Sequence, residues 1–279
     1  MSPPKAAPSP AAVPASQDSG SLRLVRLALP ILVLAAGIAM WELVVRVNDI
    51  PPYVLPAPSA IFATLVRDWG VLSQSLLTTL LTTFEGFIAA AIGGIALALL
   101  FNLSRWLEYS LFPYAVVLQV TPVIAIAPLL LIYLSQATAV VVCAFIVAFF
   151  PVLSNTTLGL NSVDRNLAGL FQLYGASRLQ TLCFLKLPAA LPFMLGGLRI
   201  AGGLSLIGAV VAEIAAGSAG AGSGLAYRIA ESGYRLNIPR MFAALLLLSA
   251  AGIVIYGLLA LTSHLLLRRW HESAIGKES

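Results

Sequence analysis

Few ionisable side chains lie inside the long apolar runs of this sequence, and they limit the chemistry that the chain can perform. Three of them, Glu85, Arg199 and Glu213, are expected at membrane depth. No Ser/His pair and no pair of carboxylates accompanies them, so the sequence does not predict acid–base or nucleophilic catalysis there. His264 and His271 have no second ligand at metal spacing, and we predict no metal site and no cofactor.

A charge at the centre of a bilayer costs ~2.5–3.5 kcal/mol on insertion scales, so each of these residues needs a partner or a role. Glu213 either lines an outer gate or cavity, or pairs with a neighbouring helix near the membrane surface. Arg199 is expected to extend its side chain toward the cytoplasmic surface. No role for Glu85 follows from the sequence.

The composition places these residues in a membrane protein. Hydrophobic residues make up 59% of the chain and charged residues 10%, whereas soluble domains carry about 25% charged residues. The apolar runs are continuous and do not alternate, which favours helices over a barrel. The net charge of +5 could indicate nucleic-acid binding, but the basic residues lie at the ends of apolar runs, as in membrane proteins. We predict an all-α, polytopic membrane protein.

Six apolar runs are long enough to cross a bilayer, which takes ~20 residues. They cover residues 27–45, 76–101, 111–134, 138–160, 193–216 and 241–267. Pro113, Pro122 and Pro128 fall inside the third run, which we expect to form one span. Gly196-Gly197 and Gly202-Gly203 in the fifth run permit the close packing that membrane helices use.

The polar parts of the chain define its organisation. Residues 1–21 are rich in Pro, Ala and Ser, and we expect a disordered tail. The membrane domain covers residues 22–270 and includes a short interfacial helix over residues 59–69, and a second tail covers residues 271–279. With both tails in the cytoplasm, most basic residues near the span ends lie on the cytoplasmic side, as membrane proteins prefer.

One polar interval between the fourth and fifth runs, the 161–192 segment, is predicted to form two short helices. The first covers residues 165–174, where apolar residues recur at three- and four-residue spacing. Gly175 then ends this helix, and a second helix over residues 178–187 stops at Pro188. Two short amphipathic helices between spans make a docking element, not a catalytic pocket.

The spacing in this segment resembles a known family. Gly175, nine residues, Leu185, one residue, then Leu187-Pro188 is similar to the cytoplasmic coupling loop of permease subunits in binding-protein-dependent ABC importers. The stretches 187–192, 197–201 and 206–213 resemble the nitrate/sulfonate/taurine branch of that family. The family's Glu-Ala-Ala falls on residues 169–171, which are Gly-Leu-Phe here.

The resemblance implies the six-helix fold of a type I importer permease and assigns roles to its residues. Coupling to an ATPase is expected of Gly175, Ala176, Ser177, Leu182, Leu185, Leu187 and Pro188. A translocation pathway is expected at Gln119, Thr121, Pro122 and Glu213, because a proline within a span frees carbonyl groups that face protein or water. A simple kink for helix packing is the alternative for Pro122.

The glycine-rich interval after the fifth run also has two interpretations. Gly220, Gly222 and Gly224 belong either to a flexible outer loop or to a periplasmic gate that faces the binding protein. The similarity of family members there favours the gate. The interval does not match the dinucleotide-binding pattern, and no G-x-x-x-x-G-K-[ST] loop occurs in the chain.

These observations predict a transport subunit without enzymatic activity. Cytoplasmic ABC ATPase subunits would supply the energy, a second permease copy would pair with this one, and a periplasmic or lipid-anchored binding protein would deliver the solute. The resemblance implies a bacterial inner-membrane protein, surrounded by lipid and without a nucleic-acid partner. The solute would be nitrate, sulfonate, taurine or bicarbonate-like, or a vitamin precursor. The alternative function is an ion-coupled secondary transporter, which needs carboxylates near the midplane.

Overall fold

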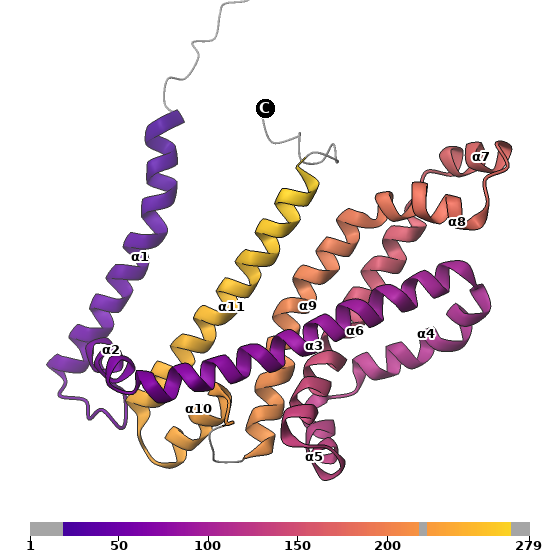
Figure 1. Cartoon of the computed structure of the whole chain (residues 1–279). Coiled ribbons are helices and arrows are strands. Elements are labelled where there is room, and N and C mark those ends of the chain that lie inside the picture. The colour runs from indigo at the N-terminus through magenta and orange to yellow at the C-terminus, as the bar shows by residue number, and fades with distance from the viewer. Residues whose placement is uncertain (1–18, 218–221, 269–279) are drawn as a thin grey trace, which may run out of the picture.

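A computed structural model describes the backbone of residues 19–217 and 222–268, and side chains from residue 28 onward. Within these ranges all regular structure is helical (Figure 1). The long helices are α1 (Ser19–Val47), α3 (Trp69–Leu103), α6 (Gln136–Asn161), α9 (Leu187–Ala216) and α11 (Ile238–Leu267). Helix α1 begins inside the predicted 1–21 tail; the rest of that tail and the 271–279 tail lie outside the described residues.

The third predicted span is not one helix. It divides into α4 (Arg105–Val120) and α5 (Val123–Tyr133), whose axes differ in direction by 99°. Pro122 cannot donate a backbone hydrogen bond, and the residue before a proline prefers extended backbone, as Thr121 shows with ψ 122°. The run predicted as the third span, residues 111–134, is therefore broken at Thr121-Pro122. Among the described residues, five helices could cross a membrane, or six if α4 and α5 together form one span.

Helices α3, α6 and α9 form the core of the bundle (Figure 1), and glycines let their backbones approach closely. A Cβ atom at Gly208 of α9 would lie 2.7 Å from the carbonyl oxygen of Cys143 on α6. Gly86 of α3 packs in the same way against Ala144. Of the predicted packing glycines, Gly197 and Gly202 contact neighbouring helices, whereas Gly196 and Gly203 face open space. Small residues thus set the distance between the core helices.

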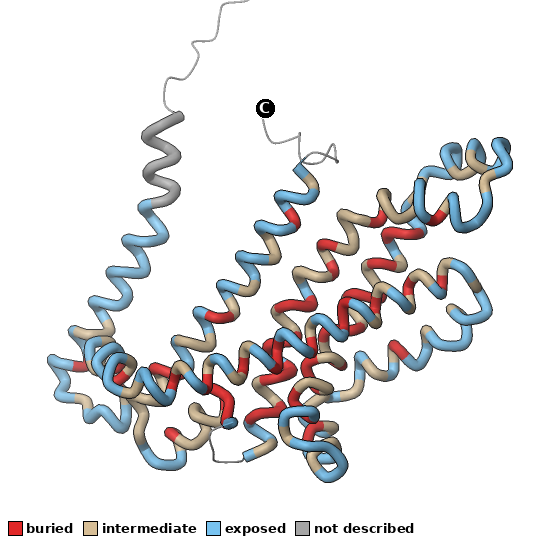
Figure 2. The backbone as a smooth tube through the Cα atoms, viewed as in Figure 1, coloured by how far each residue is buried: buried red, intermediate tan, exposed pale blue. Residues whose placement is uncertain are grey.

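Burial is concentrated on the facing sides of these three helices (Figure 2), and α1 is almost entirely exposed. Figure 1 shows α1 apart from the bundle over most of its length. It meets the bundle near its C-terminal end, where the Trp41 ring lies 5.8 Å from that of Phe242 on α11. The short helices α2 (Pro58–Arg67) and α10 (Leu225–Tyr234) lie at this same end, which we call the α10 end. Helix α2 confirms the short helix predicted over residues 59–69, with bounds that differ by at most two residues.

The 161–192 segment lies at the opposite end of the bundle, the α7 end (Figure 1). Helix α7 (Arg165–Leu173) confirms the first predicted helix. The second does not stop at Pro188: α8 (Arg178–Thr181) continues through a π-helical turn, η1 (Leu182–Lys186), directly into α9. Pro188 lies in the first turn of α9, where a missing N–H is tolerated. This proline therefore begins a helix where the sequence predicted an end.

Candidate functional site

The turn at Gly175 gives the α7 end a defined shape. Gly175 has φ +70°, the left-handed conformation that glycine adopts without a Cβ penalty. The Ser177 hydroxyl then accepts a hydrogen bond from the Gln180 N–H at 3.2 Å, and the Gln180 side chain accepts from the Ser177 N–H at 2.8 Å. This reciprocal capping box fixes the start of α8. The segment is thus a structured element and not a loose loop.

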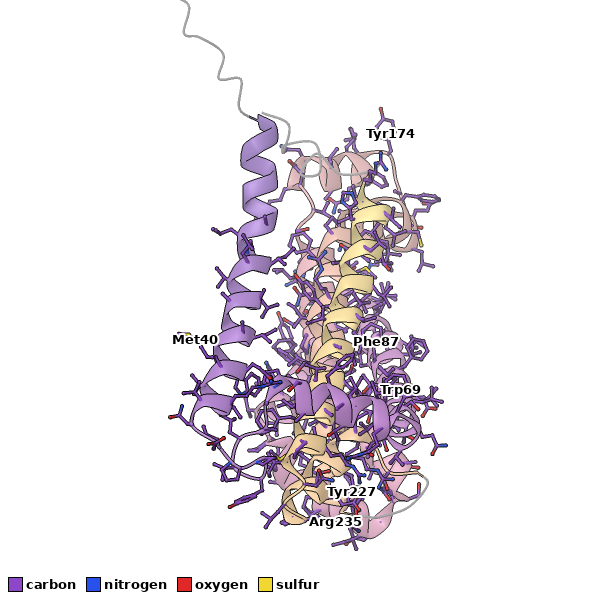
Figure 3. All side chains as sticks on the ribbon, turned by 90° about the vertical axis from the view of Figure 1, so that its left-hand side faces the viewer. Met40, Trp69, Phe87, Tyr174, Tyr227 and Arg235 are labelled. Carbon is purple, nitrogen blue, oxygen red and sulfur yellow. The ribbon has the colours of Figure 1, made fainter. Side chains whose placement is uncertain are left out.

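Several large apolar side chains of the segment are not covered by any other part of the chain that the structure describes. Leu173 is 84% exposed, Tyr174 81% and Phe184 73%. Figure 3 shows Tyr174 projecting from this end of the bundle. Exposed apolar groups that gather on one structured element are typical of a docking surface.

The bend between α4 and α5 encloses a cavity of about 330 Å³. Gln119, Thr121 and Pro122 line it from the bend, together with Pro151 of α6 and Leu204 of α9. The Thr121 hydroxyl donates to the carbonyl oxygen of Val117 at 2.7 Å, so it satisfies a group of its own helix. The cavity combines a side-chain amide with a backbone break in an otherwise mostly apolar lining.

A buried carboxylate joins three helices at the α10 end. Glu213 of α9 is only 2% exposed, and its Oε2 accepts hydrogen bonds from the Thr79 hydroxyl at 3.1 Å and from the Ala226 N–H at 3.0 Å. The Thr79 hydroxyl also accepts from the Leu225 N–H at 2.8 Å. Thr79 is on α3, whereas Leu225 and Ala226 begin α10, so this cluster holds the start of α10 against the bundle.

Gly224 is required by this arrangement. A Cβ atom at this position would overlap the carboxyl group of Glu213. Gly222 faces open space, so no close contact requires a glycine there. Gly220 lies outside the described residues. Of the predicted gate glycines, only Gly224 is shown to need its missing side chain.

Ion pairs add to the connections at the α10 end. Asp68, between α2 and α3, accepts a hydrogen bond from Arg240 of α11 at 2.6 Å and one from Arg67 at 3.1 Å. Burial alone would raise the pKa of the Asp68 carboxyl, but these two hydrogen bonds and the two positive charges outweigh it and lower the pKa below 3.8. Glu231 binds Arg228 at 2.9 Å and Arg235 at 3.0 Å.

The comparison with protein families decides what this molecule is. Residues 90–268, more than half of the chain, match the family described as "Binding-protein-dependent transport system inner membrane component". The chain belongs to this family. It is a multi-pass permease of the binding-protein-dependent ABC importers, as the 161–192 segment suggested.

Individual relatives agree with this assignment. The permease is 33% identical to a probable ABC transporter permease protein of Haemophilus influenzae, over 83% of this chain and 94% of the relative. It is 34% identical to the riboflavin transport system permease protein RibX of Chloroflexus aurantiacus (85% and 87% covered). It is 28% identical to the putative aliphatic sulfonates transport permease protein SsuC of Bacillus subtilis (87% of each).

A solved structure supports the fold. The crystal structure of an amino acid ABC transporter with histidines superposes with a TM-score of 0.60 at 20% identity, over 73% of this permease and 97% of that chain. The all-α, polytopic fold expected from the sequence is thereby confirmed.

The residues predicted to line a translocation pathway lie at two separate positions in the structure. The α4–α5 bend brings Gln119, Thr121 and Pro122 together, but Glu213 does not line their cavity. Of the two interpretations of Glu213, the pairing with neighbouring helices is the one observed. Its partner Thr79 was not predicted, because the only signal in the sequence is the polar character of 75–83 within an apolar run.

The predicted coupling residues are likewise only partly accessible. Leu182 is 6% exposed and packs in the core of the bundle, and Leu185, Leu187 and Pro188 are half-buried. Gly175, Ala176 and Ser177 form the turn as predicted. Phe184 and Leu179, which are 73% and 64% exposed, were not among the predicted coupling residues.

The remaining ionisable residues of the spans differ in their surroundings. The Arg199 guanidinium lies 5.9 Å from the centre of the Tyr256 ring on α11, a cation–π contact with a neighbouring helix. Glu85 is exposed on α3 in this single chain.

Proposed function

We propose that this permease carries a small polar solute across the inner membrane, from a binding protein to the cytoplasm, with energy from separate ATPase subunits. The observation that carries the proposal is the docking surface of the 161–192 segment. A left-handed glycine and a capping box fix its shape, and exposed Leu173, Tyr174 and Phe184 offer an apolar surface to a partner. Family membership supports an ATPase as that partner.

The distribution of charge supports a cytoplasmic position for the α7 end. Five basic residues at the α10 end each pair with a carboxylate: Arg46, Arg67, Arg228, Arg235 and Arg240. Among the described residues, the five at the α7 end form no ion pair: Arg105, Arg165, Arg178, Lys186 and Arg268. The positive-inside rule counts Lys and Arg near the ends of spans and takes little account of carboxylates. In the predicted topology the sequence has nine such residues on the side of the 161–192 segment and five on the other side.

Helix α9 offers a mechanical connection between the two ends. It continues from η1 at the ATPase-facing segment to Glu213, about 40 Å away at 1.5 Å per residue. When ATP draws the ATPase subunits together, movement of the 161–192 segment would be transmitted along α9 to the Glu213–Thr79–Ala226 cluster. The bundle would then alternate between inward-open and outward-open states, with a paired second copy completing the pathway.

The solute is proposed from the relatives and the cavity. A riboflavin permease and an aliphatic sulfonate permease are among the relatives, and the cavity at the bend is about 330 Å³. We infer a nitrate-, sulfonate-, taurine- or bicarbonate-like anion, or a vitamin precursor. An ion-coupled secondary transporter is the competing function.

Uptake into vesicles distinguishes these functions. The permease would be reconstituted with its partner ATPase and binding protein, and uptake of candidate solutes followed with ATP or with an ion gradient. We expect uptake that requires ATP and the binding protein, and no ATP hydrolysis by the permease alone. Uptake driven by an ion gradient without ATPase would reject the proposal. Phe184→Ser should weaken ATPase retention, whereas Phe62→Ser, an equally apolar exposed site at the α10 end, should not.

A further inference from the structure

A second hollow at the α7 end has the chemistry of an anion site. It encloses about 600 Å³ between the α3–α4 connection and the 161–192 segment. Three cationic residues line it, Arg105, Arg178 and Lys186, and no carboxylate does. Within the described residues neither arginine side chain forms an ion pair or a hydrogen bond, and Lys186 donates only to the Asn102 side chain, at 3.1 Å. Three cations in one hollow without a counter-ion favour an anionic ligand.

The start of α4 adds to the positive character of this hollow. Ser104, the N-cap residue, makes no side-chain capping hydrogen bond, so first-turn N–H groups of α4 remain for another acceptor. Ser104 and Arg105 are both part of the lining. The positive end of the α4 dipole therefore coincides with the three side-chain charges.

The nearest carboxylate does not neutralise the hollow. Glu108 lines an adjoining cavity of about 270 Å³, which shares Asn102, Arg105 and Lys186. Its carboxyl group forms no ion pair with these basic residues. The larger cavity thus keeps three charges available to a ligand.

The surroundings of the hollow indicate a lipid. Trp106, at its rim, is 84% exposed, and Tyr109 one turn further is 69% exposed. Exposed Trp and Tyr side chains typically lie at the headgroup level of a bilayer. Tyr114, Val117 and Val120 continue as an exposed apolar track along α4, at 72%, 60% and 70%. A phosphate in the hollow would therefore have a surface for its acyl chains beside it.

We propose that this hollow binds the headgroup phosphate of an anionic phospholipid. Arg105 from the α3–α4 connection and Arg178 from the 161–192 segment would share the phosphate oxygens, with Lys186 beside them. The bound lipid would link the docking segment to the bundle through a component of the membrane. This site is separate from the solute cavity and does not depend on the identity of the solute.

Native mass spectrometry of the full-length permease in detergent tests the proposal. The probes are phosphatidylglycerol, phosphatidylcholine and inorganic phosphate. Arg105→Gln/Arg178→Gln should weaken phosphatidylglycerol binding by roughly tenfold to thirtyfold, given the attraction of each basic residue for anionic lipid. Arg105→Lys/Arg178→Lys should retain most of the binding. The matched control Arg165→Gln/Arg268→Gln removes the same charge at the same end, outside the hollow, and should leave binding unchanged.

A second measurement leaves the three basic residues of the hollow unchanged. Brominated phosphatidylglycerol should quench tryptophan fluorescence in the wild-type chain, and Trp106→Phe should remove that part of the quenching. Three results would overturn the proposal. Inorganic phosphate could bind as tightly as the lipid, which would indicate a soluble anion. The control pair could lose as much binding as the hollow pair. The hollow variant could keep its lipid but lose its ATPase, which would make an acidic ATPase surface the occupant.

Discussion

The backbone of Gly224 lies directly against the carboxyl group of Glu213, and no Cβ atom fits between them. This contact allows the Ala226 N–H to reach the carboxylate and leaves Glu213 only 2% exposed. The start of α10 and the far end of α9 are therefore one unit. Any movement of α9 along its axis must either carry α10 with it or break the cluster.

Gly224→Ala should weaken the contact between the start of α10 and the end of α9. The added methyl group must displace the start of α10 or the Glu213 carboxyl, and overpacking of this kind costs about 1–3 kcal/mol. Thermal unfolding of the purified permease should show a lower Tm than wild type. Gly222→Ala is the matched control, since Gly222 faces open space, and its Tm should be unchanged. Equal Tm values for the two variants would mean that the contact is absent in the protein.

Thr79→Val should also destabilise the α10 end. The valine keeps the shape of threonine but removes the donor to Glu213 and the acceptor for the Leu225 N–H, which leaves buried polar groups unpaired at about 1–3 kcal/mol. Thr78→Val is the control, because the Thr78 hydroxyl bonds only to a carbonyl of its own helix. Hydrogen exchange at Leu225 and Ala226 should speed up in the first variant only.

The lowered pKa of Asp68 predicts that the connection between α3 and α11 weakens in acid. Its pKa is below 3.8 in the folded protein, because the hydrogen bonds and charges of Arg240 and Arg67 outweigh its burial. A lowered pKa means that the carboxylate stabilises the fold above pH 3.8 and loses that contribution as the pH falls through the folded pKa. Unfolding measured from pH 6 down to pH 2 should show this loss below about pH 3.8 in wild type, whereas Asp68→Asn should lack that part of the pH dependence. Parallel curves for both proteins would contradict the prediction.

Gly175→Val should uncouple the permease from its ATPase without removing it from the membrane. A non-glycine residue in the left-handed region costs on the order of 1 kcal/mol, and a β-branched one more. The change should tilt α7 against α8 and weaken ATPase co-purification at matched expression, with a smaller effect for Gly175→Ala. Gly169→Ala, in a helical position with open space, serves as the control. Wild-type coupling in the valine variant would exclude this turn from the docking surface.

The sequence predicted those features that depend on local composition. Apolar runs located five long helices, and Gly175 marked a left-handed turn, since both signals lie within a few residues. Pro122 broke the third span while Pro113 and Pro128 did not, although all three look alike in sequence. What separates them is the packing of α4 and α5 around the bend.

The candidate site was harder to predict because it depends on distant pairings. Thr79 and Glu213 are 134 residues apart, and no local pattern connects them. Leu182 and Phe184 are both apolar members of one short run, yet Leu182 is 6% exposed and Phe184 73%. Their directions follow from the backbone of η1, which has no clear sequence signature.

The π-helical turn η1 determines which side of the 161–192 segment faces outward. A π turn holds one residue more than an α turn, and one residue corresponds to about 100° around an α-helix. If the residues from Leu182 to Lys186 wound as regular α-helix with no residue removed, α8 would be rotated by about that angle relative to α9. The helix would remain unbroken, yet Leu179 would point in a new direction. The orientation of the docking surface thus depends on the length of one turn, and on nothing in the surface itself.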